Sequence, residues 1–409
     1  MKKWMYILLF AATALSAVSC IYDFDPDVYS DGAGIRIFEG NILAGDYTEI
    51  VVSKTVALND TVYDWSKNSI MNDYSLKMYI ECEDGTVIDN EGYGYYKFDT
   101  RNIDPSKRYR LVALGADRTN GTTPSWVFDP LLSFGYKKLR YESPWLEVLD
   151  SAPIDSLSYE IKGPDKISFR VTSSAGSTHY FYWRGRETWE FTAQLYTLDR
   201  YNVREKAIMQ YPNGENRYYC WQDSNLPFLM TTSSEMNEGE KLVNYEIYSY
   251  GNNERKLSYL YSVEIIQECI PEESYRYYET MHRNNTDVGG LFSPQPSAVR
   301  GNILNMEDTL EYVVGYISAS KVSKSRIFYD NLKERFCKYR DAPLPEPTIL
   351  GRSEWAWGHG QGLGPYAPYY NPDGYSPPDA YEWYPVRCLD CTKNGGHKIK
   401  PDYWPNDHT

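Results

Sequence analysis

The sequence lacks the residue patterns on which many enzymes depend. It contains no G-x-S-x-G, no H-E-x-x-H and no phosphate-binding glycine loop, so it gives no support to the corresponding hydrolases, metalloproteases or nucleotide-binding proteins. Histidine is scarce, and its five positions show no spacing typical of metal ligands: His179, His282, His359, His397 and His408. We therefore expect a protein that is not an enzyme and that holds no cofactor or metal.

Positive charge is also in short supply. The 409 residues carry 42 Lys and Arg against 56 Asp and Glu, which gives a formal net charge of −14. Loss of an N-terminal segment with Lys2 and Lys3 would take this charge to −16. A negative excess of this size argues against nucleic acid and anionic lipid headgroups as partners.

No apolar run long enough to span a membrane follows residue 20. Before it, Lys2 and Lys3 lead into the apolar stretch Trp4–Ala14, which is typical of a secretory signal peptide. Small residues then precede Cys20, as in the sequence that lipoprotein signal peptidase cleaves. We predict that residues 1–19 are removed and that Cys20 carries a membrane-anchoring lipid. An ordinary signal peptide with an incidental cysteine is the alternative.

An acidic stretch follows Cys20. Residues 20–34 include Asp23, Asp25, Asp27 and Asp31 and predict a flexible tether. Acidic residues at this place resemble the surface-export signal of Bacteroidetes lipoproteins. We therefore expect an outer-membrane protein that faces the cell surface, with an inward-facing location as the alternative.

Tyrosine is abundant, with 40 residues, and the chain is rich in short strand-like runs. Ile35–Gly40, Tyr47–Ser53, Leu76–Cys82 and Tyr109–Leu114 are examples, separated by turn residues. This pattern predicts an all-β protein that begins with an immunoglobulin-like β-sandwich over residues 35–143.

Residues 144–342 predict a larger β-rich domain, with strands such as Leu257–Ile266 and Leu310–Ser318. One short helix is expected after Pro271, because acidic residues follow that proline and basic ones come about ten residues later. Residues 343–409 are rich in Pro, Gly, Tyr and Trp, with few aliphatic side chains. They predict a tail of long loops that packs on the main domain and has no core of its own.

Six cysteines remain if Cys20 carries lipid: Cys82, Cys220, Cys269, Cys337, Cys388 and Cys391. An even number in an oxidising compartment predicts three disulfides of open connectivity, which would staple the C-terminal tail to the body. Free thiols are one alternative. A zinc site that combines the C-x-x-C of Cys388 and Cys391 with His397 or Cys337 is another, although the spacing fits no standard zinc pattern.

Three further sets of residues are candidates for surface chemistry. The aromatic cluster, a hypothetical ligand platform, consists of Trp355, Trp357, Tyr366, Tyr369, Tyr370 and Trp383. Asp-Ser/Thr-apolar triplets resemble a periplasmic O-glycosylation sequence and mark Thr61, Ser151, Ser156 and Thr309. Glu187 and Glu190 could mimic a glycosidase pair, but in a strand they would face opposite sides, so we interpret both as solvated surface residues.

Several motifs, taken in this order, resemble a family of Bacteroidetes lipoproteins catalogued as domain of unknown function 4249. They are Pro153–Leu157, Glu187–Phe191, Cys220-Trp221, Tyr261–Val263, Phe292–Ser297, Gly301–Ile303, Gly315–Ser320, Arg326–Phe328, Cys388–Cys391 and Lys400–Trp404. The resemblance extends over essentially the whole mature chain. Cys82 and Cys269 lie outside the family pattern and are a candidate additional pair.

The resemblance implies no activity. It implies a setting like that of outer-membrane lipoproteins that accompany TonB-dependent transporters. We therefore expect a non-enzymatic accessory or binding component of a nutrient uptake system. A free-standing glycan- or ligand-binding surface lipoprotein that uses the aromatic cluster is the alternative.

Overall fold

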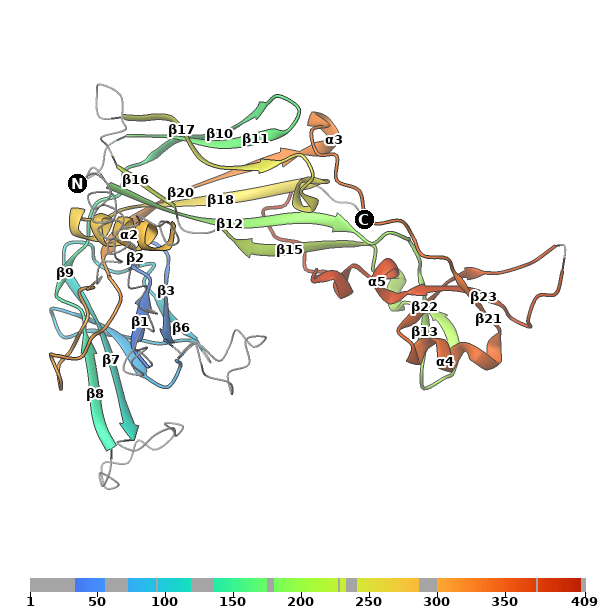
Figure 1. Ribbon diagram of the computed structural model, residues 1–409, viewed down its shortest axis with the longest axis horizontal. Coiled ribbons are helices and arrows are strands. Elements are labelled where there is room, and N and C mark those ends of the chain that lie inside the picture. The colour runs from blue at the N-terminus through green and yellow to red at the C-terminus, as the bar shows by residue number, and fades with distance from the viewer. Residues whose placement is uncertain are drawn as a thin grey trace, which may run out of the picture.

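The computed structural model describes residues 34–55, 73–92, 95–118, 136–174, 180–226, 229–232, 241–286, 300–372 and 374–405. Three units make up the structure (Figure 1): an N-terminal sandwich beneath one end of the main sandwich, the main sandwich itself, and a small C-terminal lobe beyond its other end. The predicted all-β fold is confirmed. No helix in these ranges is both long and apolar enough to cross a membrane. Cys20, the tether before residue 34 and Thr61 lie outside the described residues.

The N-terminal unit is a sandwich of two sheets. The first sheet has the order β1 (Arg36–Glu39), β3 (Tyr47–Lys54), β6 (Tyr96–Asp99). The second has the order β19 (Leu304–Asn305), β8 (Tyr136–Glu142), β7 (Arg108–Arg118), β4 (Lys77–Cys82), β5 (Val87–Asp89), with β9 (Leu146–Glu147) beside β7. Without β19 and β9, these orders are those of immunoglobulin strands A-B-E and G-F-C-C′, as predicted.

The core of this sandwich comes from alternate residues of facing strands. In β3 and β4 every second side chain is buried, including Ile50, Val52, Met78 and Ile80. A segment from much later in the chain completes the core, because Ile303, Val313 and Ile317 pack into it.

The main sandwich pairs a long sheet with a three-stranded one. The long sheet has the order β15 (Tyr219–Asn225), β12 (Tyr180–Thr192), β18 (Leu260–Cys269), β20 (Ala319–Asp330), β2 (Ile42–Ala44), with β16 (Leu229–Thr232) also beside β12. The other has the order β10 (Ile154–Lys162), β11 (Lys166–Ser174), β17 (Lys241–Gly251). Their facing side chains form the largest core, with Phe169, Trp183 and Val263 fully enclosed.

The predicted helix is confirmed as α2 (Glu272–Thr286) at the end of this sheet nearest the N-terminal sandwich (Figure 1). The carbonyl of Pro271 accepts the first helical hydrogen bond, from Tyr275 N at 3.1 Å, so the proline precedes the helix directly. Tyr275 and Tyr278 stack on β12, with ring centroids 5.0 Å from Tyr180 and Tyr182. The short helices at the other end are η5 (Arg255–Leu257) and α3 (Asn331–Glu334).

The predicted strand Leu310–Ser318 was wrong. The structure has only an isolated bridge at Val314 in this segment, and Leu310 is 91% exposed. Gly315 explains the difference, because its φ of +138° is incompatible with regular strand geometry for other residues. A Cβ at Gly301 would lie 1.5 Å from the Gly315 oxygen, so the two glycine-containing family motifs pack directly on each other.

The N-terminal and main sandwiches share backbone and buried polar contacts. β2 pairs in parallel with β20, with Ile42 opposite Ala319. Buried Asn41 donates to Glu268 Oε2 at 3.0 Å and accepts from Ser318 N at 3.1 Å. Glu268 is fully buried and pairs with Arg184 of the same sheet. The junction is therefore continuous in hydrogen bonding.

The C-terminal lobe has a core of its own, so the prediction of a core-free tail was wrong. Its sheet has the order β21 (Thr348–Leu350), β23 (Tyr381–Pro385), β22 (Leu363–Pro368). The hairpin β13 (Asp199–Asn202)/β14 (Ala207–Gln210) of the main domain is a separate two-stranded sheet that packs against the lobe core. Its short helices are η3 (Pro212–Gly214), η6 (Arg352–Glu354), α4 (Trp355–Gly360), α5 (Val386–Leu389) and η7 (Cys391–Asn394). Aromatic rings supply the bulk that the missing aliphatic residues would otherwise provide, with Trp383 fully buried.

Candidate functional site

The candidate ligand-binding features lie on the lobe and at its base. One is a groove on the lobe surface, and the other is a cleft where the end of the main sandwich meets the chain that runs to the lobe. The lobe is at the end of the molecule opposite the N-terminal sandwich, and the cleft lies between the two, at the end of the main sandwich that faces the lobe (Figure 1).

The predicted aromatic cluster does not form one platform. Trp355 and Trp383 are buried in the lobe core, and Tyr366 packs against a second small cluster around Cys388 and Leu389. These three rings hold the lobe together. Trp357 and Tyr370 are the members that face solvent, with 57% and 78% of their surface exposed.

The lobe groove measures about 630 Å³. Tyr369, Tyr370 and Tyr381 line it, together with Trp355. Its charged residues, Arg352 and Asp379, form a mutual ion pair at 3.5 Å. The groove thus offers aromatic surface and little uncompensated charge, which suits a neutral ligand.

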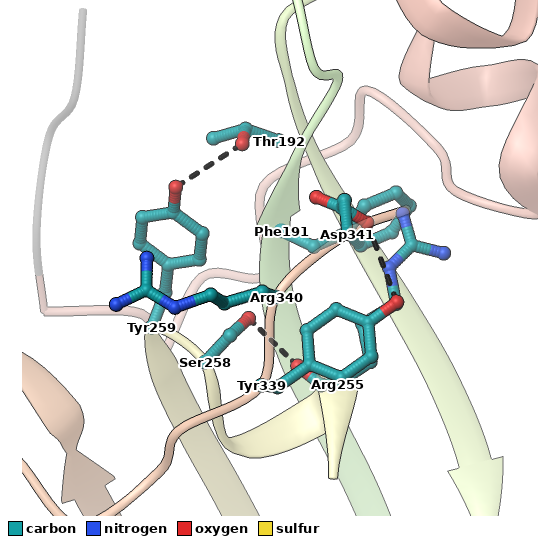
Figure 2. A pocket seen from close by; sticks show the side chains of 8 residues that line it. All are labelled: Phe191, Thr192, Arg255, Ser258, Tyr259, Tyr339, Arg340 and Asp341. Atoms are coloured by element: carbon teal, nitrogen blue, oxygen red, sulfur yellow. Dashed lines mark hydrogen bonds between the residues drawn. The ribbon is translucent and has the colours of Figure 1, made fainter. Parts of the chain in front are cut away.

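The cleft at the base of the lobe measures about 290 Å³ and is shown in Figure 2. Eight residues line it: Phe191, Thr192, Arg255, Ser258, Tyr259, Tyr339, Arg340 and Asp341. They come from the end of β12, from η5 and the two residues after it, and from the segment that follows α3. Three distant stretches of sequence therefore meet at one hollow.

Contacts within the cleft fix several of these side chains. The Arg255 guanidinium lies over the Phe191 ring, 4.2 Å from its centroid. Tyr259 and Thr192 share a hydrogen bond of 3.2 Å, and the Tyr339 hydroxyl donates to Asp341 at 3.3 Å (Figure 2). Burial raises the pKa of Tyr339, and Asp341 adds to this effect while Arg255 opposes it. Tyr339 therefore stays a hydrogen-bond donor at neutral pH.

Glu187 and Glu190 are not surface residues, so that interpretation was wrong. They are 2% and 1% exposed, because both faces of β12 are covered. The expectation that they would not converge is confirmed, since Glu187 lies on the core side with Trp183 and Trp189. The Glu187 carboxylate accepts from Lys256 Nζ at 2.9 Å and from the hydroxyl of Tyr250 at 2.7 Å.

The hydroxyl of Tyr261 donates to Glu187 Oε2, the oxygen that also accepts from Tyr250, at 2.8 Å. Burial holds the pKa values of Tyr250 and Tyr261 well above the usual range for tyrosine, so both remain donors. A carboxylate whose oxygens are occupied by a cation and two phenols is a structural group inside the core.

One disulfide is present among the described residues, between Cys220 on β15 and Cys391 on η7. It ties the C-terminal segment to the main sheet, as predicted for the tail. The prediction of three disulfides was wrong, because Cys82, Cys269, Cys337 and Cys388 are free thiols.

Position explains why these four stay unpaired. Cys82 lies in the N-terminal core and Cys388 in the lobe. Cys269 ends β18, whereas Cys337 contacts Glu254 beyond the other end of that ten-residue strand. A strand of this length spans about 30 Å, and a disulfide needs Cα atoms within about 7 Å. Cys82 and Cys269 are buried free thiols in different cores, so they do not form the additional pair.

The zinc alternative has no support in the described part of the chain, where no group of three or more His, Cys, Asp or Glu side chains is placed to hold a metal. His397 Nε2 instead lies 2.9 Å from Asp223 Oδ2. Three O-glycosylation candidates can be located: Ser156 and Thr309 are exposed and Ser151 is half-buried.

Comparison with known proteins gives one family. Residues 132–326 match the family described as Domain of unknown function (DUF4249), which supports the resemblance noted in the sequence. The match begins just before β8 and ends within β20, so it covers just under half of the chain and is narrower than the resemblance suggested. No curated protein matches the sequence.

Proposed function

We propose that this protein is a lipid-anchored outer-membrane lipoprotein, exposed on the cell surface, that serves as a non-enzymatic binding component of a TonB-dependent nutrient uptake system. The observation that carries the proposal is the order of the units. The chain enters the described structure through the N-terminal sandwich, whereas the groove lies on the lobe at the opposite end and the cleft lies at the end of the main sandwich that faces the lobe (Figure 1). A lipid on Cys20 would place the sandwich next to the membrane and present the lobe outward.

Two measurements test this proposal. Cys20→Ala should move the protein from the membrane to the soluble fraction of cells, whereas Cys82→Ala, which changes a free thiol, should not. Purification of the intact protein in mild detergent should recover a β-barrel transporter with it. Repeated recovery of the lipoprotein alone would count against the uptake role.

A free-standing ligand-binding surface protein is the second candidate, supported by the groove lined by Tyr369, Tyr370 and Tyr381. Screening against neutral glycans tests it, with Tyr370→Ala as the variant and Trp357→Ala as the control, since Trp357 is exposed but lies outside the groove. Equal loss of binding in both variants would contradict use of the groove.

A further inference from the structure

The cleft at the base of the lobe carries positive charge that its surroundings do not neutralise. Within the described residues, neither the Arg255 nor the Arg340 guanidinium lies within 4 Å of a carboxylate. Asp341 also lines the cleft, but its hydrogen bond is to Tyr339. Two unpaired arginines at one hollow are unusual in a protein with a net charge of −14.

Positive charge continues along the chain beyond the cleft. The segment 333–340 holds Lys333, Arg335, Lys338 and Arg340 against the single acid Glu334. Lys333 pairs with Asp330 at 3.3 Å, whereas Arg335 and Lys338 are exposed and form no ion pair within the described chain. Arg340 is thus the end of a basic stretch, and Arg255 joins it at the cleft from η5.

The remaining lining favours a sugar over a bare anion. Tyr259 and Tyr339 contribute aromatic surface, on which sugar rings stack. Asp341 and Thr192 supply acceptors for sugar hydroxyls, which a simple anion such as sulfate does not carry. Figure 2 shows the Arg340 and Arg255 guanidinium groups on opposite sides of residues 339–341, so they could hold separate carboxylates of one chain.

We infer that this cleft binds a carboxylated oligosaccharide, with uronic acid residues paired to Arg255 and Arg340. Guanidinium groups pair with carboxylates through two parallel hydrogen bonds, which gives geometric selectivity as well as charge attraction. A cleft of about 290 Å³ accommodates little more than one sugar ring, and the basic stretch would contact the rings that follow. This inference rests on the binding role proposed above and names its ligand class.

Calorimetric titration of the full mature chain in mild detergent tests it. The probes are a short oligogalacturonate, its neutral methyl ester, sodium sulfate and a short single-stranded DNA. We expect binding of the oligogalacturonate, at least tenfold weaker binding of the methyl ester, and no saturable binding of sulfate or DNA. Equal affinity for the methyl ester, or tighter binding of sulfate or DNA, would overturn the inference.

Variants locate the site. Arg255→Gln and Arg340→Gln should each weaken oligogalacturonate binding about tenfold or more, because each removes a charge-assisted contact. Arg340→Lys should bind more tightly than Arg340→Gln but less tightly than the unmodified protein, because lysine restores the positive charge without the two parallel hydrogen bonds of the guanidinium group. Arg204→Gln is the matched control, an exposed arginine on the turn of the β13/β14 hairpin outside the cleft. Unchanged affinity in both glutamine variants would refute the assignment.

The titration needs neither a lipid nor a transporter. A negative co-purification therefore leaves the ligand assignment intact, and a failed titration leaves the uptake role open to its own test.

Discussion

The disulfide between Cys220 and Cys391 permits the most quantitative prediction. It closes a loop of 171 residues that contains β18 and β20, two central strands of the main sheet. The chain-entropy relation gives roughly 5 kcal/mol for closing a loop of this length in the unfolded chain. Measured values are commonly lower, so we expect the Cys220→Ala/Cys391→Ala double variant to lose about 2–4 kcal/mol.

Thermal unfolding followed by circular dichroism measures this loss. For a domain of this size, it corresponds to a melting temperature lower by roughly 5–15 °C. Cys337→Ala is the control, because Cys337 is a half-buried free thiol and its substitution should change the melting temperature little. A double variant with the same melting temperature as the unmodified protein would refute the loop-closure reasoning. A reductant should lower the melting temperature of the unmodified protein and leave that of the double variant unchanged.

Three further substitutions follow from the buried contacts. Glu187→Gln should lower the free energy of unfolding in urea by about 2–4 kcal/mol, because it leaves Lys256 without its anion. The control Glu160→Gln, at an exposed position, should lower it by less than about 1 kcal/mol, and similar losses in both variants would contradict a structural role for Glu187. Gly301→Ala should prevent stable folding or cost at least about 3 kcal/mol, because its Cβ would overlap a backbone oxygen; soluble protein with unchanged stability would contradict this packing. Burial alone would raise the pKa of Asp46, but Lys324 and Arg186 hold this pKa below its usual range. The stability that these ion pairs contribute is therefore present above about pH 4 and is lost as the pH falls through the lowered pKa. Asp46→Asn should therefore flatten the fall in melting temperature under acid, and an unchanged acid profile would refute this.

The sequence was most informative where structure depends on local alternation. The strand-like runs Tyr47–Ser53 and Leu76–Cys82 located β3 and β4, and the order of proline, acidic and basic residues located α2. The opposite orientation of Glu187 and Glu190 also followed from strand geometry alone. Their burial did not, because the partners Lys256 and Tyr250 lie more than 60 residues away and no local pattern shows that a second sheet covers β12.

The lobe and the cleft were harder to predict for the same physical reason. The lobe core is built from aromatic rings and is completed by Tyr201 and Ile208, which precede β21 by about 140 residues. Its own segment therefore looked too poor in aliphatic residues to fold. Arg255 and Arg340 are brought together only by the tertiary fold. The basic stretch 333–340 was the one local pattern that could have drawn attention to the cleft.

The two connections between units differ in their physical basis. The N-terminal junction combines the β2–β20 pairing, the buried hydrogen bond from Asn41 to Glu268 and the ion pairs of Asp46 with Arg186 and Lys324. All of these would have to break together for the sandwiches to separate. The C-terminal region is joined by the Cys220–Cys391 bond, by the backbone bridge between Trp221 and His397, and by small apolar clusters shared with the main domain. Isolated hydrogen bonds add to these, such as Gln194 Nε2 to the Ala342 oxygen at 2.6 Å. Isolated hydrogen bonds near the surface contribute only about 0.5–1.5 kcal/mol each. The disulfide is the covalent link among the described contacts of the C-terminal region. The cleft lies beside this connection, because residues 339–341, which form one of its walls, belong to the segment that leads into the lobe.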